Sequence, residues 1–306
     1  MEQEFIAWLR GRLKPHKLLR LGPGDDAAVL EMAAQDGALV TVDLLTDTVD
    51  FHLDQVDPRR VGRKALAVNL SDIAAMAGSP LAAVIALALP RQNALDLAIT
   101  LYEGLLPLAE RYDVAIAGGD TNCWDGPLVI AITLLGRPSA RGPLTRSGAR
   151  PGDRILVTGA FGGSILGRHL DFEPRVHEAQ LLHERYRLHA GIDVSDGLSL
   201  DLARLAAAGD VGAVVQLGNV PIAADARRLS ASSGDGRTPL DHALADGEDF
   251  ELVLAVGPEE AGRIVADQPL DVRLTDIGEF VAEPGLWKID ATGRREPLEP
   301  RGFLHR

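Results

Sequence analysis

The sequence predicts a mixed α/β fold arranged as two domains. Short apolar runs alternate with segments of helical periodicity, which is typical of sheets covered by helices. The chain has 306 residues, a length that suits two domains of ordinary size. Its composition, with 46% hydrophobic and 25% charged residues, is that of a globular protein with a packed core.

The apolar runs predict strands in both halves of the chain. They cover residues 39–42, 83–89, 114–117 and 128–135 in the first half, and 154–157, 213–217 and 251–256 in the second. Helical periodicity predicts helices from Pro58 to about Ala77, from about Ala94 to Tyr112, and from about Leu198 to Ala208. Asp57 followed by Pro58 provides an N-cap and a proline at the first helical position.

A segment rich in Pro, Gly and Arg, residues 137–153 (RPSARGPLTRSGARPGD), is interpreted as a linker. We therefore predict an N-terminal domain over residues 1–148 and a C-terminal domain over residues 149–306.

Charge and cysteine content exclude several classes of protein. The chain has 31 Lys and Arg against 44 Asp and Glu, a net charge of −13, which argues against nucleic acid or an anionic membrane as the main partner. No apolar run approaches the ~18 residues of a membrane span, and the N-terminus lacks the pattern of a signal peptide. The one cysteine, Cys123, cannot form an intramolecular disulfide. These features predict a soluble, cytoplasmic protein.

Aspartates recur where apolar runs meet turns that contain glycine. Asp43 and Asp120 each end an apolar run, so we expect their carboxylates to meet at one edge of a sheet. Asp72 lies inside an apolar stretch, where an unpaired charge is costly. A further acidic turn covers Asp246–Asp249. Several carboxylates together suit Mg²⁺ or Mn²⁺, and magnesium usually accompanies substrate phosphates.

The sequence offers two candidate phosphate-binding elements, and each has an alternative interpretation. The chain has no P-loop motif, which excludes that class of kinase. Residues 158–164 (TGAFGGS) follow a predicted strand, and their amide groups either cradle an anion or form a plain tight turn. Arg146 either clamps a phosphate or lies in solvent.

Together these motifs resemble the thiamine-monophosphate kinase family, from the superfamily of aminoimidazole ribonucleotide synthetase and selenophosphate synthetase. The matching stretches follow the family's order along nearly the whole chain: GPGDDAAVL (22–30), KALAVNLSDIAAMAG (64–78), GGDT (118–121), LTRSGARPGD (144–153), IDVSDGLSLDL (192–202) and DGEDFELV (246–253).

The resemblance implies a two-domain α/β fold, a homodimer joined through the N-terminal sheets, and a C-terminal domain that completes the nucleotide and substrate site. It also implies ATP- and Mg²⁺-dependent phosphorylation of thiamine monophosphate to thiamine diphosphate. In that family, the positions that match the following residues bind several magnesium ions: Asp26, Thr41, Val42 (through its backbone), Asp43, Asp72, Asp120, Asp193 and Asp196. The positions that contact ATP match Tyr102, Gly119, Asp120, Arg146 and Ser195, and those that contact the acceptor match Glu248 and Phe303.

The chain departs from the family pattern in two places, both on the acceptor side. The family has a G-x-H-F pattern after the strand of Asp43, whereas here Asp50 occupies the histidine position and His52 follows two residues later. We place Asp50 with the substrate-binding residues. The connection between His177 and Ala190 is also shorter than in the family.

The expected reaction is direct, in-line transfer of the ATP γ-phosphoryl group, assisted by metal and without a catalytic side-chain base. A phosphate acceptor is already largely a dianion at pH 7, so it needs no deprotonation. Two alternatives stay open: a related ATP-dependent synthetase of the same superfamily, and a non-catalytic nucleotide-binding homologue with an altered acceptor site.

Overall fold

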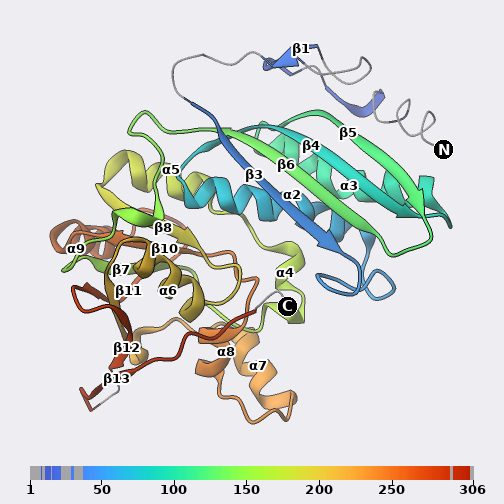
Figure 1. The fold of residues 1–306 in the computed structure, drawn as a ribbon. Coiled ribbons are helices and arrows are strands. Elements are labelled where there is room, and N and C mark those ends of the chain that lie inside the picture. Colours follow the sequence, from blue (N-terminus) through green and yellow to red (C-terminus); the bar gives the residue numbers. More distant parts are fainter. Residues whose placement is uncertain are drawn as a thin grey trace. The chain divides into compact units, whose positions relative to one another are not determined.

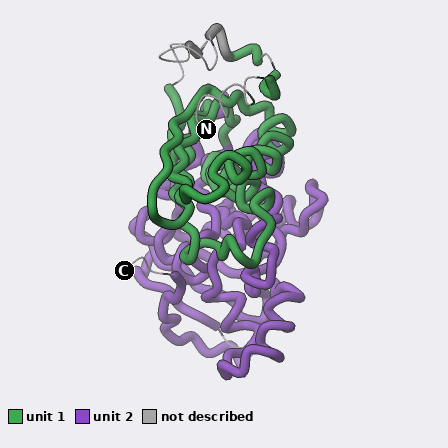
Figure 2. Tube along the Cα trace, turned by 90° about the vertical axis from the view of Figure 1, so that its right-hand side faces the viewer, with its two compact units in different colours: residues 1–73, 78–138 green, residues 74–77, 139–306 purple. Residues whose placement is uncertain are grey.

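The computed structural model describes Trp8 and residues 11–14, 16–21, 29–30, 37–289 and 292–303. The chain forms two compact units: unit 1 comprises residues 1–73 and 78–138, and unit 2 comprises residues 74–77 and 139–306 (Figure 2). The division at Pro138–Ser139 falls inside the segment rich in Pro, Gly and Arg. Within the described residues, no helix combines the length and apolar character needed to cross a membrane.

Unit 1 is built on a four-stranded sheet with the strand order β3-β6-β4-β5. Its strands are β3 (Leu39–Thr46), β4 (Ser79–Pro90), β5 (Ala115–Trp124) and β6 (Val129–Arg137), and a separate antiparallel pair joins β1 (Leu19–Leu21) to β2 (Val29–Leu30). Only β4 and β5 are parallel. Two helices, α2 (Pro58–Ala75) and α3 (Ala94–Arg111), cover one face of the four-stranded sheet (Figure 1).

The two faces of this sheet differ because side chains alternate along each strand. On β3, Leu39 and Leu45 are buried toward the helices, whereas Val40, Val42 and Leu44 are 61–63% exposed on the opposite face. The same open face carries Val84 of β4. Within the described residues, unit 1 therefore has one sheet face covered by helices and an opposite face on which these four side chains are exposed.

Helices α2 and α3 cross at two glycines. A Cβ atom added at Gly104 would lie 1.8 Å from the carbonyl oxygen of Arg59, and one added at Gly62 would lie 1.9 Å from that of Leu101. The two backbones approach so closely that no larger side chain fits at either position.

Unit 2 contains a seven-stranded sheet with the order β13-β12-β9-β11-β7-β10-β8, in which only β9 and β12 are parallel. Its strands are β7 (Arg154–Thr158), β8 (Leu188–Asp193), β9 (Gly212–Gln216), β10 (Leu252–Val256), β11 (Leu274–Val281), β12 (Gly285–Ile289) and β13 (Arg295–Pro297). Its α-helices are α4 (Arg168–Asp171), α5 (Val176–Arg185), α6 (Leu198–Ala208), α7 (Ala224–Ser232), α8 (Pro239–Ala245) and α9 (Pro258–Asp267). Short 3₁₀ helices are η1 (Arg146–Gly148), η2 (Ser164–Leu166) and η3 (Leu217–Asn219).

The core of unit 2 lies between its sheet and α6. Ile155 and Val157 of β7 and Ile192 of β8 pack in one cluster with Leu202 and Leu205 of α6. Each of these fully buried apolar side chains stabilises the fold by about 1.5–3 kcal/mol.

The mixed α/β class and all the strands and helices predicted above are confirmed. The helix from Leu198 to Ala208 has the predicted limits. Strands β3 and β5 are longer than predicted, because their main-chain pairing with β6 and β4 continues past Asp43 and Asp120. Both aspartates therefore lie inside strands and not at their ends.

We expect Gly104→Ala to lower the free energy of unfolding by about 1–3 kcal/mol or more, since the added methyl group would press on the Arg59 carbonyl. The matched control is Gly262→Ala in α9, where a Cβ would meet nothing within 4 Å. This control should raise stability by about 0.5–1 kcal/mol through helix propensity. Denaturant unfolding of both variants checks the pair; equal effects would contradict the close helix crossing.

Candidate functional site

A cluster of carboxylates lies between β3 and α2 in unit 1. Thr41 and Asp43 are on the helix-covered face of β3, and the Thr41 hydroxyl donates a hydrogen bond to the carboxylate of Asp72 on α2. The structure thus brings together three of the residues predicted to bind metal.

Asp43 is the least compensated carboxylate of this cluster. Its Oδ2 atom is buried and has no hydrogen-bond partner among the described residues. Burial, followed by the charges of Asp72 and Asp50, raises the pKa of Asp43 to about 7. A divalent cation would supply the missing positive charge, and oxygen ligands of this kind suit magnesium.

The described residues do not form a complete metal site by themselves. Among them, no three His, Cys, Asp or Glu side chains are placed so that they could hold a metal ion. Asp26, a further predicted ligand, lies outside the described residues.

The expectation that Asp43 and Asp120 meet at one sheet edge is wrong within a single chain. β3 and β5 form opposite edges of the sheet. The register aligns Leu44, Ala131, Ala86 and Asp120 in one row, so Asp120 shares the open face, whereas Asp43 faces the helices. The cause is the alternation of side chains along strands that are longer than predicted.

Asp50 closes its own turn. Its Oδ2 atom accepts a hydrogen bond from the Thr46 amide at 2.7 Å, and its carbonyl oxygen accepts one from the buried Lys64 ammonium at 2.9 Å. The Asp50 carboxylate therefore organises the turn after β3 and adds negative charge near Asp43.

Three further predicted residues lie elsewhere in unit 1. Tyr102, on α3, is buried, and its ring meets Trp8 edge to face at a centroid distance of 6.5 Å. Gly119 lies beside Ile85 of β4, where a Cβ would come 1.9 Å from the Ile85 carbonyl oxygen. The side chain of Val42 points to the open sheet face, which leaves only its backbone for any ligand role.

Unit 2 brings together four of the predicted nucleotide, metal and acceptor residues. The Glu248 amide donates to the carbonyl of Ser195 at 2.6 Å, and the Phe303 amide donates to the carbonyl of Asp196 at 2.9 Å. The Phe303 side chain is 50% exposed. The turn after β8, the acidic loop before β10 and the C-terminal segment therefore meet at one place.

Asp201 shapes the turn that carries Ser195 and Asp196. Its Oδ2 atom accepts hydrogen bonds from the amides of Asp196 at 2.9 Å and Gly197 at 3.1 Å. Burial, with a contribution from the charge of Asp196, raises the pKa of Asp201, although the Asp196 amide and Arg204 favour its ionised form.

Two predicted residues of unit 2 have contrasting surroundings. Asp193 is buried at the end of β8. Arg146 is exposed in η1, and its side chain has no hydrogen bond or ion pair within the described part of the chain.

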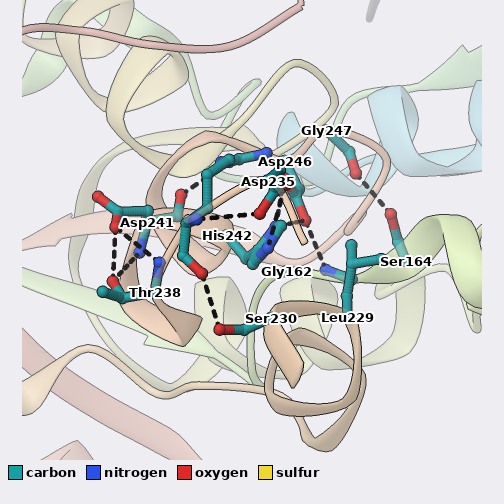
Figure 3. A network of polar contacts seen from close by, with 12 residues as sticks. Gly162, Ser164, Leu229, Ser230, Asp235, Thr238, Asp241, His242, Asp246 and Gly247 are labelled. Atoms are coloured by element: carbon teal, nitrogen blue, oxygen red, sulfur yellow. Dashed lines mark hydrogen bonds and ion pairs between the residues drawn. The ribbon is translucent and has the colours of Figure 1, made fainter. Parts of the chain in front are cut away.

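The acidic run from Asp246 to Glu251 is matched by donors of unit 2 itself. Asp246 accepts from the Gly163 amide at 2.9 Å and lies 2.8 Å from an Arg237 nitrogen and 3.0 Å from His242 Nδ1. Figure 3 shows this network, in which Ser164 also donates to the Gly247 carbonyl. Three protein donors thus compensate Asp246.

Asp249 and Glu251 are compensated in the same way. The Gly162 amide contacts both oxygens of Asp249 at 2.9 and 3.0 Å, and Arg168 contacts one of them at 2.7 Å. Burial raises the pKa of Asp249 to about 7, although Arg168 and Gly162 favour its charged form. Glu251 accepts from Thr158 at 2.6 Å and from two nitrogens of Arg175 at 2.6 and 2.8 Å.

These contacts bear on two features of the sequence that could be interpreted in more than one way. The amides of Gly162 and Gly163 bind the protein's own carboxylates, so of the two alternatives for residues 158–164 these contacts favour the tight turn over the phosphate cradle. Likewise, Asp246 and Asp249 of the acidic turn mainly hold neighbouring segments of unit 2 together through hydrogen bonds and ion pairs.

Sequence reasoning missed the basic side chains beside the acidic run from Asp246 to Glu251, which are Arg168, His169 and Arg175. A signal was present, since a dense acidic run beside an apolar strand needs compensating charges. The segment 168–175 carries three basic side chains shortly after the glycine turn.

Comparison with known proteins places these features in a family. Residues 24–137 match the family model "AIR synthase related protein, N-terminal domain", and residues 150–287 match "AIR synthase related protein, C-terminal domain". The chain is 46% identical over 312 residues to the thiamine-monophosphate kinase of Rhodopirellula baltica, which covers 100% of this chain and 97% of the relative.

Two solved structures are similar over nearly the whole chain. The thiamine-monophosphate kinase of Stenotrophomonas maltophilia has 31% identity and a TM-score of 0.78, with 94% of each chain covered. The structure of AaThiL complexed with AMPPCP and TMP has 26% identity and a TM-score of 0.76, covering 98% of this chain and 94% of that one.

Replacing Arg168 by Leu should lower the free energy of unfolding by about 3–5 kcal/mol, because it leaves the buried Asp249 carboxylate without its cation. The control is Arg228→Ala, which removes an arginine that is 68% exposed in its ion pair with Asp225 and should cost at most about 1 kcal/mol. Chemical denaturation of both variants tests this; similar losses would mean that the acidic run does not depend on Arg168.

Asp43→Asn should stabilise the protein in the absence of divalent cations, in a way that depends on pH. The folded pKa of Asp43 lies above its value of 3.8 in the unfolded chain, so ionisation costs stability progressively between about pH 4 and pH 7. The gain on substitution should therefore be near zero at pH 4 and on the order of 1–3 kcal/mol above pH 7. Thermal unfolding in EDTA measures this gain, and a constant or negative effect would argue against an uncompensated carboxylate.

Proposed function

The chain belongs to the thiamine-monophosphate kinase family, and on this premise we propose that it catalyses ATP-dependent phosphorylation of thiamine monophosphate to thiamine diphosphate. The observation that carries the proposal is family similarity along the whole chain. The grouping of Ser195, Asp196, Glu248 and Phe303 in unit 2 supports it, since the family's nucleotide, metal and acceptor positions coincide there. An ATP-containing, reducing compartment fits the single cysteine, so we place the protein in the cytoplasm.

The acceptor explains why no catalytic base is required. A phosphate monoester with a second pKa of about 6 is largely a dianion at neutral pH, and its oxygen can attack without losing a proton. The barrier comes instead from repulsion between two polyanions and from their alignment. We therefore assign no general base to this site.

We propose that magnesium binds at the carboxylates of unit 1. The uncompensated Asp43 oxygen, with Asp72 and Thr41 beside it, fits a divalent cation. When bound, magnesium neutralises charge on the phosphate groups. The remaining ligand positions stay predictions from the family: Asp26, the Val42 backbone, Asp120, Asp193 and Asp196.

For three further residues, Arg146, Glu248 and Phe303, the surroundings support a binding role. The exposed guanidinium of Arg146 can bind a phosphate through two parallel hydrogen bonds. Glu248 and the half-exposed Phe303 offer a carboxylate and an aromatic face to the acceptor's cationic ring system. Tyr102, Gly119 and Ser195 as nucleotide contacts, Asp50 as an acceptor contact, and the domain boundary near residue 148 stay predictions.

We further propose that two copies associate through the open face of the unit 1 sheet. Val40, Val42, Leu44 and Val84 form an exposed apolar face that a second copy can cover by symmetry. Asp120 lies on this face, so dimerisation would change its surroundings.

An end-point assay with ATP, Mg²⁺ and thiamine monophosphate tests the proposed reaction. We expect thiamine diphosphate and ADP in equal amounts, and no product when EDTA removes the metal. Formation of ADP with only free phosphate would indicate a synthetase-type reaction. Nucleotide binding without any ADP would indicate a non-catalytic homologue.

Charges on the open sheet face should dissociate the dimer. We expect the double variant Val40→Glu/Leu44→Glu to halve the mass measured by light scattering, because it places charges in an apolar interface. The control, Ile165→Glu, changes an apolar side chain of unit 2 that is equally exposed, at 63%, and should leave the mass unchanged. A wild-type monomer, or a dimer insensitive to the double variant, would contradict this interface.

A further inference from the structure

Glu248 has a buried basic neighbour. The Nδ1 atom of His169, on α4, lies 3.1 Å from the Oε2 atom of Glu248. The His169 residue is 5% exposed, whereas the Glu248 side chain is 29% exposed. A histidine from the interior therefore supports a carboxylate that is open to solvent.

Neighbouring contacts hold His169 in place. The residue before it, Arg168, is bound to Asp249 at 2.7 Å. At the other end of α4, the Phe172 ring stacks on Phe250 with a centroid distance of 4.0 Å and an interplanar angle of 16°. Contacts on both sides of His169 thus fasten this short helix to the acidic loop, and the imidazole has little freedom to turn away.

The backbone of Glu248 is equally constrained. Its φ angle is 60°, a left-handed conformation that is uncommon for a residue other than glycine. Its amide donates to the Ser195 carbonyl at 2.6 Å. Because the main chain is fixed, the direction of the carboxylate depends on what holds the end of the side chain.

We infer that His169 is a positioning residue for the acceptor, acting through Glu248; this inference rests on the proposed function. An ionised carboxylate can only accept hydrogen bonds, so Nδ1 is the nitrogen that carries hydrogen toward Oε2. That contact orients the carboxylate and keeps it an acceptor for an N–H group of the substrate. The amino group on the pyrimidine ring of thiamine monophosphate is a donor of this kind.

Substitutions that move or remove the donor test the inference. His169→Asn retains an N–H near the Nδ1 position, His169→Gln moves it toward the Nε2 position, and His169→Leu removes it. We expect the Leu and Gln variants to raise KM for thiamine monophosphate about tenfold or more, as expected for loss of a hydrogen bond to a charged group. KM for ATP should change less than about twofold, and Asn should restore KM for the acceptor to within about threefold.

The matched control is His189→Leu. His189 also directs Nδ1 to a carboxylate, that of Asp153, at 2.9 Å, but it lies outside the acidic loop and its partners. This variant should lose stability without any change in KM for thiamine monophosphate.

The outcomes separate this inference from the proposed function. If wild-type protein phosphorylates thiamine monophosphate but the Leu and Gln variants raise KM for both substrates equally, or Asn and Gln behave alike, His169 has only a structural role. Comparison of the Asn and Gln variants tests the positioning role of His169 even if the Leu variant does not fold. Wild-type protein that neither binds nor phosphorylates thiamine monophosphate would refute the proposed function itself, and this inference with it.

Discussion

The buried carboxylates between Asp246 and Glu251 need hydrogen-bond donors and cations beside them, and the arrangement of unit 2 depends on this constraint. An isolated charge at the depth of Asp249 would be prohibitively costly, so the glycine turn and α4 must lie where their amides and cations reach it. The same contacts set the backbone of Glu248 and join it to the Ser195 turn. These buried acids thereby hold in place Glu248, the most exposed acid of the run.

The carboxylates of the two units differ in the donors that surround them. This difference distinguishes acids with a structural role from candidate metal ligands. Asp246, Asp249 and Glu251 each have cationic and neutral donors within hydrogen-bond distance. Asp43 has an oxygen without a partner among the described residues and two like charges nearby. Counting acidic residues in the sequence cannot make this distinction, because it depends on which donors surround each one.

Local patterns were sufficient to predict the elements of the fold. The Asp57-Pro58 start of α2, the limits of α6 and the apolar runs of the strands all depend on neighbouring residues. What could not be predicted depends on pairing between distant segments. The faces of Asp43 and Asp120 follow from how far β3 and β5 continue to pair, and the anions bound by Gly162 and Gly163 come from more than eighty residues away. Family resemblance pointed to Glu248, but only the structure placed His169 beside it.

The most direct test of this account is a crystal structure of the protein with Mn²⁺, a non-hydrolysable ATP analogue and thiamine monophosphate, with metal located by anomalous scattering. We expect manganese at the carboxylates of Asp43 and Asp72, none on Asp246 or Asp249, and the aminopyrimidine ring at Glu248. Manganese bound to the 246–251 run, or thiamine monophosphate bound away from Glu248, would contradict both the division between structural and ligand carboxylates and the proposed acceptor site.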